Sequence, residues 1–308
     1  MRAFIFPGQG SQAVGMGSAL AGASRAAKDV FDEVDEALGQ NLSRLMRDGP
    51  DEQLRLTENA QPAIMAHSIA VLRTMGVKLA DVADFVAGHS LGEYSALCAA
   101  GSFDLSTTAK LLKLRGQAMQ QAVPVGQGAM AALLGADLAL AQKIAEAAAQ
   151  GEVCTVANDN DPSQVVISGH KGAIDRAIEL AKEMGAKRAI ALPVSAPFHC
   201  PLMQPAAEAM RDALSYVVLA EPAVPLYANV TAQSETDPDT IRNQLVDQVT
   251  GMVRWRESVA NMFDAGVHEF VEIGGKVLGA MVKRIAPDAS VTSVVTIEDV
   301  ETLAKEIA

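Results

Sequence analysis

A residue pattern suited to a nucleophilic serine lies at Gly88-His89-Ser90-Leu91-Gly92. The apolar segment Phe85–Ala87 before it predicts a short buried strand, and the segment after it predicts a helix that closes at Gly101. Glycines on both sides of Ser90 permit the tight strand-to-helix turn that lifts a serine hydroxyl out of a sheet. The N–H of Leu91, at the helix N-terminus, would then point toward a developing oxyanion. Such a pattern also recurs by chance, and its place between strand and helix favours the chemical interpretation.

A serine hydroxyl needs a base, and the five histidines of the chain are the ordinary candidates. His199 lies in the loop Ser195–Pro201, which prolines bound and stiffen. His89 is adjacent to the serine, but neighbouring side chains at the apex of such a turn diverge. We interpret His67 as a helix-face residue and His268 as a loop residue. We therefore expect His199 to be the base, although an isolated histidine of this kind is as often a packing or surface residue.

Composition narrows the class of protein. The chain has 308 residues, of which 49% are apolar and 4% aromatic, enough for one large domain carrying an insertion or for two domains. The net charge of −12 argues against binding to nucleic acid or to anionic membranes. Apolar stretches such as Ala129–Leu134 are too short to span a bilayer, and no signal-peptide core can form before Pro7. We expect a cytoplasmic protein.

The potential metal ligands are scattered. The three cysteines, Cys98, Cys154 and Cys200, form no metal-like pair and are odd in number, which is typical of a reduced cytosolic protein with incidental thiols. The histidines show no HExxH or similar spacing. We therefore expect no metal site.

Strands and helices alternate in the first part of the chain. Arg2–Phe6 predicts a strand that enters a turn at Pro7. One apolar helix face ends before Gly39, a second helix is expected to begin at Pro62 and stop at Gly76, and a third spans about 105–122. The same alternation resumes after residue 195. This alternation of strands and helices predicts an α/β domain.

The middle of the chain changes rhythm after the linker candidate Pro124–Gly128. Short connections join strand, helix, strand, strand, helix and strand, in the segments Met130–Leu134, Leu138–Ala149, Val153–Ala157, Val165–Ser168, Ala173–Met184 and Arg188–Pro193. This βαββαβ order is the ferredoxin-like pattern. We therefore expect a small ferredoxin-like subdomain over 125–195, inserted into a large domain made of 1–124 and 196–308.

Motifs from nearly the whole chain together resemble those of one known family. They occur in the order Phe4–Gln12, Asn59–Pro62, Gly88–Tyr94, Leu114–Gly116, Val165–Gly169, Pro197–His199 and Asn229–Thr231. In this combination the chain resembles the malonyl-CoA–acyl carrier protein transacylases, which load malonyl units for fatty-acid synthesis. The resemblance implies an α/β-hydrolase-like acyltransferase domain that carries the ferredoxin-like insert.

The resemblance assigns the reacting groups. Ser90 would be the acylated nucleophile and His199 its general base and acid. Gln9 and the N–H of Leu91 would form the oxyanion hole. Arg115 would hold the malonyl carboxylate through a bidentate ion pair, a task that suits its planar guanidinium.

The resemblance also implies supporting residues. The backbone carbonyl of Gln248 would orient the histidine in place of a triad aspartate. Phe198 would add bulk against branched acyl chains, and Met119 and Asn158 match positions near the active site.

The implied partners are malonyl-CoA, free CoA and the phosphopantetheine thiol of an acyl carrier protein, with no cofactor, and we expect a monomer. Two successive acyl transfers through serine make a ping-pong reaction. Carrier proteins of this kind are acidic, and so is this chain, so docking would need a local basic surface. Candidates are the second half of the insert (Lys171, Arg176, Lys182, Lys187 and Arg188) and the stretch Lys276–Arg284. Ordinary solvated faces explain these charges equally well.

Other readings of the same residues stay open. A serine thioesterase or lipase-like hydrolase uses the same turn around its serine, but it gives no reason for Arg115 or for the insert. A non-catalytic protein that binds carrier protein is a second alternative, and it has no need of Ser90, His199 and Arg115 together. An acyltransferase of a polyketide pathway would share every motif.

Overall fold

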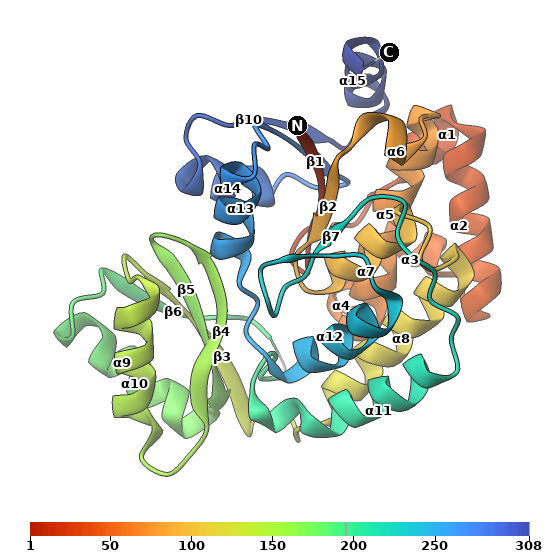
Figure 1. Cartoon of the computed structure of the whole chain (residues 1–308). Coiled ribbons are helices and arrows are strands. Elements are labelled where there is room, and N and C mark those ends of the chain that lie inside the picture. The colour runs from red at the N-terminus through yellow and green to blue at the C-terminus, as the bar shows by residue number, and fades with distance from the viewer. Residues whose placement is uncertain (195, 308) are drawn as a thin grey trace.

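Two β-sheets organise the computed structural model, which describes residues 1–194 and 196–307 (Figure 1). Within these residues the larger sheet has six strands in the order β10-β9-β1-β2-β7-β8. Neighbouring strands run parallel except β7 and β8. The strands are β1 Arg2–Phe6, β2 Phe85–Gly88, β7 Leu226–Tyr227, β8 Ser234–Glu235, β9 Glu269–Ile273 and β10 Ser290–Val294.

Both faces of the larger sheet are covered, as a continuous apolar run such as that of β1 requires. Phe4 and Phe6 point into the core under α2, α5 and α8, whereas Ala3 and Ile5 point into a second cluster under α13 and α14. The helices that accompany this sheet are α1 Ser18–Ala23, α2 Arg25–Leu38, α3 Leu42–Asp48, α4 Asp51–Arg55, α5 Thr57–Met75, α6 Leu79–Val82, α7 Leu91–Ala99, α8 Leu105–Gln121, α11 Gln204–Ser215, α12 Pro238–Thr250, α13 Trp255–Asp264, α14 Leu278–Ile285 and α15 Ile297–Ile307, with a 3₁₀ turn η1 at Pro201–Met203. Within the described residues, every helix is too short or too polar to cross a membrane.

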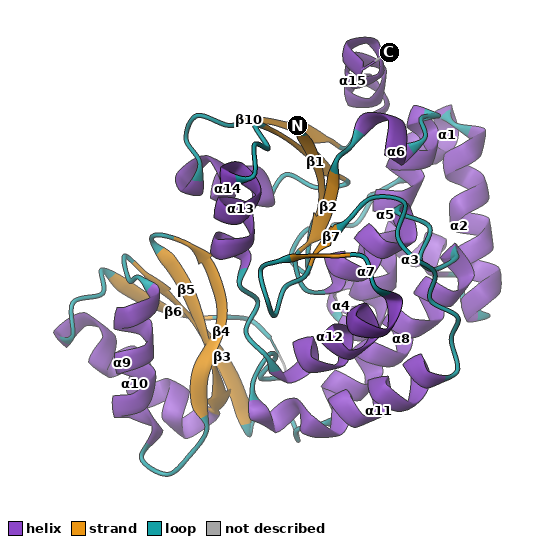
Figure 2. Cartoon of the chain, in the orientation of Figure 1, coloured by secondary structure: helices purple, strands orange, loops and turns teal. Residues whose placement is uncertain are grey.

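The smaller sheet is the ferredoxin-like unit that the sequence predicts. Its elements are β3 Gly128–Leu134, α9 Leu138–Ala149, β4 Cys154–Asp161, β5 Gln164–His170, α10 Lys171–Glu183 and β6 Arg188–Ala191. Its strands lie in the order β4-β5-β3-β6, with neighbours antiparallel. Helices α9 and α10 cover the face turned away from the larger sheet (Figure 2). The expected end of the insert, residue 195, lies outside the described residues, and the proposed domain boundaries stay a prediction.

Two buried carboxylates on β4 join the smaller sheet to helices of the larger one. Asp159 accepts from Arg256 of α13, with 2.8 Å between nitrogen and oxygen. Asp161 accepts from Arg284 of α14 at 2.7 Å. Both aspartates are almost fully buried, so removing either arginine would leave a charge without a partner. These pairs fix the position of β4 relative to the larger sheet.

Two sequence predictions about element bounds are wrong. Pro62 does not begin a helix but lies inside α5, which starts at Thr57. Its missing N–H forfeits one helical hydrogen bond, and the burial of nearly all of α5 outweighs that loss. Strand β4 extends to Asp161 rather than stopping at Ala157. The polar end of β4 is typical of a turn, but it is paired with β5 and, at Asn158, bridged to Val253.

The turn between β2 and α7 is as tight as the Gly88–Gly92 spacing predicts. A Cβ atom at Gly88 would lie 1.9 Å from the backbone of Gly92, and one at Gly92 would lie 2.2 Å from the carbonyl oxygen of Phe6. Ser90 itself has φ 55° and ψ −111°, a backbone conformation that side-chain-bearing residues rarely adopt. The glycines thus let α7 approach the sheet closely enough to force Ser90 outward.

We expect Gly88→Ala to destabilise the protein by about 3 kcal/mol or more, because backbone rather than a movable side chain blocks the added methyl group. The measurement is the free energy of unfolding in denaturant. Gly22→Ala in α1 is the matched control, since no atom lies within 4 Å of its added Cβ. The control should change stability by less than about 1 kcal/mol. A wild-type unfolding midpoint for Gly88→Ala would contradict the close approach.

Candidate active site

A cavity of about 280 Å³ opens where the two sheets face each other. In the larger part of the protein, the cavity is lined by the turn around Ser90, by the loop that leads to His199, and by Arg115 of α8. From the smaller part it takes Met130 of β3, Asn158 of β4 and the segment Leu192–Val194. Every predicted catalytic, oxyanion-hole and substrate-binding residue lines this cavity, and the predicted histidine-orienting residue Gln248 lies directly behind it.

The structure brings Ser90 and His199 together although 109 residues separate them. The distance from Ser90 Oγ to His199 Nε2 is 2.8 Å. His199 Nδ1 donates to the backbone carbonyl of Gln248, also at 2.8 Å. Because a carbonyl can only accept, the neutral ring carries its proton on Nδ1 and leaves Nε2 free to take the serine proton. This is the geometry of a nucleophile and its base.

The electrostatic surroundings keep the base neutral. Burial and the nearby Arg115 guanidinium lower the pKa of His199 to about 3, although its bond to Gln248 opposes the shift. An imidazole with this pKa holds no proton at Nε2 near neutral pH. It is therefore ready to accept one.

Arg115 lies fully inside the protein, with 1% of its surface exposed. Its Nη1 donates to Gln61 Oε1 at 2.7 Å, and its Nη2 donates to Gln248 Oε1 at 2.7 Å and to Ser90 Oγ at 3.1 Å. The guanidinium also lies 5.6 Å from the centre of the Tyr94 ring. Among the described residues none forms an ion pair with it, so its charge is solvated only by neutral groups beside the reacting serine.

The predicted oxyanion donors lie at the same cavity. Leu91 is the first residue of α7, where backbone N–H groups have no partner within the helix. Gln9 lies in the loop after β1, and its side-chain oxygen accepts from Thr57 Oγ1 at 2.9 Å. Both residues line the cavity next to Ser90.

The three looser predictions also line the cavity. Met119 is buried on α8, and its sulfur accepts from Gln61 Nε2 at 3.8 Å. Asn158 contributes from β4, and Phe198 packs against the apolar face of the smaller sheet that includes Met130. These side chains form the walls around Ser90.

Three other histidines, His67, His89 and His268, lie as the sequence predicts. His89 turns away from Ser90, and its Nε2 lies 2.8 Å from Asn160 Oδ1. His67 is buried on α5, and the loop residue His268 packs edge-on against Phe263 with 4.9 Å between ring centres. None of them contacts the serine hydroxyl in the described structure.

Sequence reasoning missed the residues that hold the site in shape. Asn229 Oδ1 accepts from the N–H of Ser90 at 2.8 Å, and its Nδ2 donates to the carbonyl of Gly88 at 2.7 Å, so it braces the turn. Gln61, Glu93 and Asn160 hold Arg115, Gln248 and His89 respectively. All but Asn160 lie within motifs noted above. Asn160 lies between Asp159 and Asp161, in a polar run that gives no signal of a buried role.

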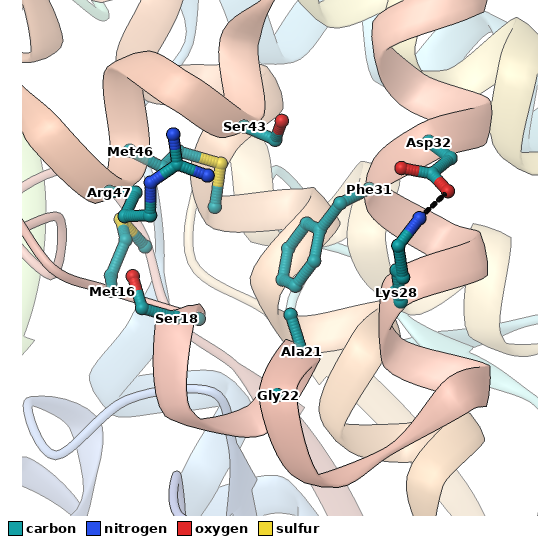
Figure 3. A pocket seen from close by; sticks show the side chains of 11 residues that line it. Met16, Ser18, Ala21, Gly22, Lys28, Phe31, Asp32, Ser43, Met46 and Arg47 are labelled. Atoms are coloured by element: carbon teal, nitrogen blue, oxygen red, sulfur yellow. Dashed lines mark hydrogen bonds and ion pairs between the residues drawn. The ribbon is translucent and has the colours of Figure 1, made fainter.

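A second cavity, of about 270 Å³, lies between α1, α2 and α3 (Figure 3). Phe31 and two methionines give it an apolar floor, and Lys28 at its rim is paired with Asp32. The described residues that line it include serines but no histidine, so it holds no nucleophile with a base. Across residues 1–194 and 196–307, no group of three or more His, Cys, Asp or Glu side chains is placed to hold a metal ion.

Comparisons with known proteins show the family to which the chain belongs. The model of the acyl transferase domain family matches residues 3–297. The malonyl CoA-acyl carrier protein transacylase of Escherichia coli K12 is 45% identical over 284 residues, which are 92% of each chain. The structure of the acyl-carrier-protein S-malonyltransferase from Bartonella henselae matches with a TM-score of 0.97 and 51% identity, covering 99% of both chains. A malonyl-transacylase solved in complex with a type II polyketide acyl-carrier protein matches with a TM-score of 0.96 and 40% identity, again over 99% of both chains. This chain therefore belongs to the acyl transferase domain family and, within it, to the malonyl CoA–acyl carrier protein transacylases.

Proposed function

We propose that this protein transfers the malonyl group of malonyl-CoA to the phosphopantetheine thiol of an acyl carrier protein through a malonyl-serine intermediate. The observation that carries the proposal is the buried guanidinium of Arg115, which has no carboxylate partner in the described structure and lies 3.1 Å from Ser90 Oγ. A serine acylated by a dicarboxylic thioester would place the distal carboxylate beside this charge. The names of the relatives support the same substrate and acceptor.

In the first half-reaction His199 Nε2 takes the proton of Ser90, and Oγ attacks the thioester carbonyl. The resulting oxyanion is held by the N–H of Leu91 and by Gln9, a kind of contact worth about 2.7–4 kcal/mol for one donor. Collapse of the tetrahedral intermediate breaks the C–S bond, and the imidazolium returns the proton to the departing CoA sulfur. Gln248 keeps the ring oriented throughout.

In the second half-reaction His199 deprotonates the carrier thiol, whose sulfur attacks the malonyl-serine carbonyl. The same oxyanion donors act again, and Ser90 leaves with the proton from His199. Arg115 pairs with the distal carboxylate in both halves. An acetyl group would leave the guanidinium unpaired, which disfavours it. Phe198, Met119 and Asn158 confine the acyl group around this pair.

Docking of the acidic carrier protein is proposed at the second half of the smaller subdomain. Lys171 pairs with Asp175 at 2.6 Å and Arg176 with Glu152 at 2.7 Å, so these two cations are partly neutralised. The cations proposed to contact the carrier protein are therefore Lys182, Lys187 and Arg188. In the other candidate stretch, Arg284 is committed to the buried Asp161.

The remaining assignments complete the proposal. Residues 1–124 and 196–308 would form the catalytic domain and 125–195 the inserted subdomain, as the two sheets suggest. The protein would act as a monomer, without a cofactor, because serine and histidine suffice for thioester exchange. Its three free cysteines favour the reducing cytoplasm. We place the reaction in fatty-acid biosynthesis, and the relative solved with a polyketide carrier protein makes a polyketide pathway the second candidate.

Mass spectrometry of the intact protein after mixing with malonyl-CoA should show one added malonyl group, which Ser90→Ala abolishes. His199→Ala should slow acylation by about 10²-fold or more, since it removes the general base. Adding phosphopantetheinylated carrier protein should then yield malonyl-carrier. Accumulation of free malonate instead would identify a thioesterase, and a label that persists in Ser90→Ala would contradict the assignment of the nucleophile.

Arg115→Ala should lower kcat/KM for malonyl-CoA by two to three orders of magnitude, because a buried ion pair contributes about 3–5 kcal/mol. The same variant should keep or gain activity with acetyl-CoA, whose methyl group no longer faces an unpaired charge. Lys113→Ala is the matched control: Lys113 lies two residues away on α8 and pairs with Glu58 at 2.7 Å. A parallel fall with both thioesters would make Arg115 structural.

On the acidic side, kcat/KM should begin to fall only at a pH far below the pKa that is usual for histidine. With the pKa of His199 lowered to about 3, kcat/KM for serine acylation by acetyl-CoA, which has no distal carboxylate for Arg115 to recognise, should stay level from pH 8 down to about pH 5. Unfolded histidine titrates near 6.5, so between pH 6.5 and 3 the unfolded state binds the extra proton, and the stability that His199 contributes is lost as pH falls through that window. Stopped-flow acylation rates check the first expectation, and a midpoint near pH 6.5 would contradict it.

A further inference from the structure

The buried carboxylate of Glu93 has no part in the transfer steps described above. Glu93 is the third residue of α7, three positions after the nucleophile, and 1% of its surface is exposed. A carboxylate in the first turn is favoured by the helix dipole, but burial of a charge is unfavourable unless specific donors receive it. Its position therefore calls for partners.

Two N–H donors from different segments converge on Glu93. The backbone N–H of Asn229, after β7, donates to Oε1 at 3.2 Å. The side-chain Nε2 of Gln248, near the end of α12, donates to Oε2. A carboxylate accepts at both oxygens, whereas an amide in its place can accept at only one. The site thus requires an acid and not merely a polar residue of this shape.

The bond to Glu93 sets which way the amide of Gln248 points. With Nε2 turned to Glu93, to the carbonyl of Ser90 at 3.1 Å and to Asn229 Oδ1 at 3.3 Å, Oε1 is left facing Arg115 Nη2 at 2.7 Å. The reversed amide would direct an NH₂ group at the guanidinium, donor against donor. The orientation of Gln248 Oε1, which accepts from Arg115 Nη2, therefore depends on Glu93, although Glu93 makes no bond to Arg115.

We propose that Glu93 is a positioning residue for acyl-group selectivity, which fixes the amide of Gln248 and thereby aims Arg115 at the distal carboxylate of the substrate. This inference rests on the proposed function, since it deepens the account of how the malonyl group is recognised. It assigns Glu93 no contact with substrate.

The ionised form of Glu93 is the one that accepts both donors. Burial raises the pKa of Glu93 to about 7, and Gln248, Asn229 and the charge of Arg115 each oppose that rise. Among the described residues the other titratable groups that interact with Arg115 are Tyr94 and His199, and His89 acts in turn on His199. Tests of the proposal are therefore best made at pH 8, where the carboxylate form prevails.

The experiment compares Ser90 acylation by malonyl-CoA and by acetyl-CoA at pH 8, followed by intact mass. Glu93→Gln keeps the shape but offers one acceptor oxygen instead of two and puts a donor in place of the other, which loosens the amide of Gln248, so the malonyl-to-acetyl ratio of kcat/KM should fall by about 10- to 100-fold. In the Arg115→Ala background the same substitution should change the ratio no further, because the two residues act through one contact. An unchanged ratio in Glu93→Gln, or independent effects in the double variant, would overturn the proposal.

Glu272→Gln is the matched control. Glu272 is equally buried and accepts backbone N–H groups of Val277 and Leu278 at 2.8 and 2.9 Å, at the start of α14 and outside the cavity. Its substitution should lower the melting temperature without moving the malonyl-to-acetyl ratio. A ratio that falls as far in Glu272→Gln as in Glu93→Gln would mean that general loosening, not the aim of Arg115, sets selectivity.

A second variant covers the case in which Glu93→Gln does not fold. Gln248→Met removes the amide that links Glu93 to Arg115 and keeps the backbone carbonyl on His199. The ratio should fall here as well, and an unchanged ratio would overturn the proposal. Failure of the wild-type protein to form malonyl-serine would instead refute the proposed function itself, so the two failures are distinguishable.

Discussion

The positive charge of Arg115, buried without a carboxylate beside it, is the constraint around which the site is built. Burying an ion is unfavourable unless its hydrogen bonds are met, and here the oxygens of Gln61, Gln248 and Ser90 accept from Nη1 and Nη2, whereas Nε has no partner in the described structure. Neutral acceptors hold the guanidinium in place, and the carboxylate of Glu93 acts on its charge only through space. An anionic acyl group can then gain the full interaction on arrival, in a site that needs no rearrangement.

Backbone strain at the site is held by the same surroundings. Ser90 and His199 both have φ of 55°, and Asn229 braces the turn at the N–H of Ser90 and at the carbonyl of Gly88. Strain of this kind persists only where the neighbouring structure over-determines it. Close packing of Gly88 against Gly92 and the bridge from Val253 to β4 supply that rigidity. The side chains of Ser90 and His199 are therefore held in position before the substrate binds.

The sequence carries the local part of this arrangement and not the long-range part. The glycine spacing around Ser90 predicts the turn, and the alternation of 130–193 predicts the smaller sheet. The pairing of Ser90 with His199 joins segments over 100 residues apart, and both the proline-bounded loop and the family resemblance indicated it. The bond between Arg115 and Gln248, which also joins segments over 100 residues apart, was not predicted. Pro62 and the polar end of β4 misled local reasoning because burial and ion pairs outweigh intrinsic preference. Asn160 and Glu93 gave no signal beyond their polarity.

The double role of Gln248 explains why a backbone carbonyl, and not a carboxylate as in other serine enzymes, orients the base at this site. Its main-chain carbonyl orients the base and its side chain holds the arginine, so one residue of α12 links nucleophile activation to acyl recognition. An aspartate orienting His199 would bring a negative charge within reach of Arg115 and neutralise the charge that the substrate carboxylate needs. A carbonyl oxygen orients the ring without that competition. The one carboxylate nearby, Glu93, bonds the far end of the Gln248 amide, so its charge reaches Arg115 only through space.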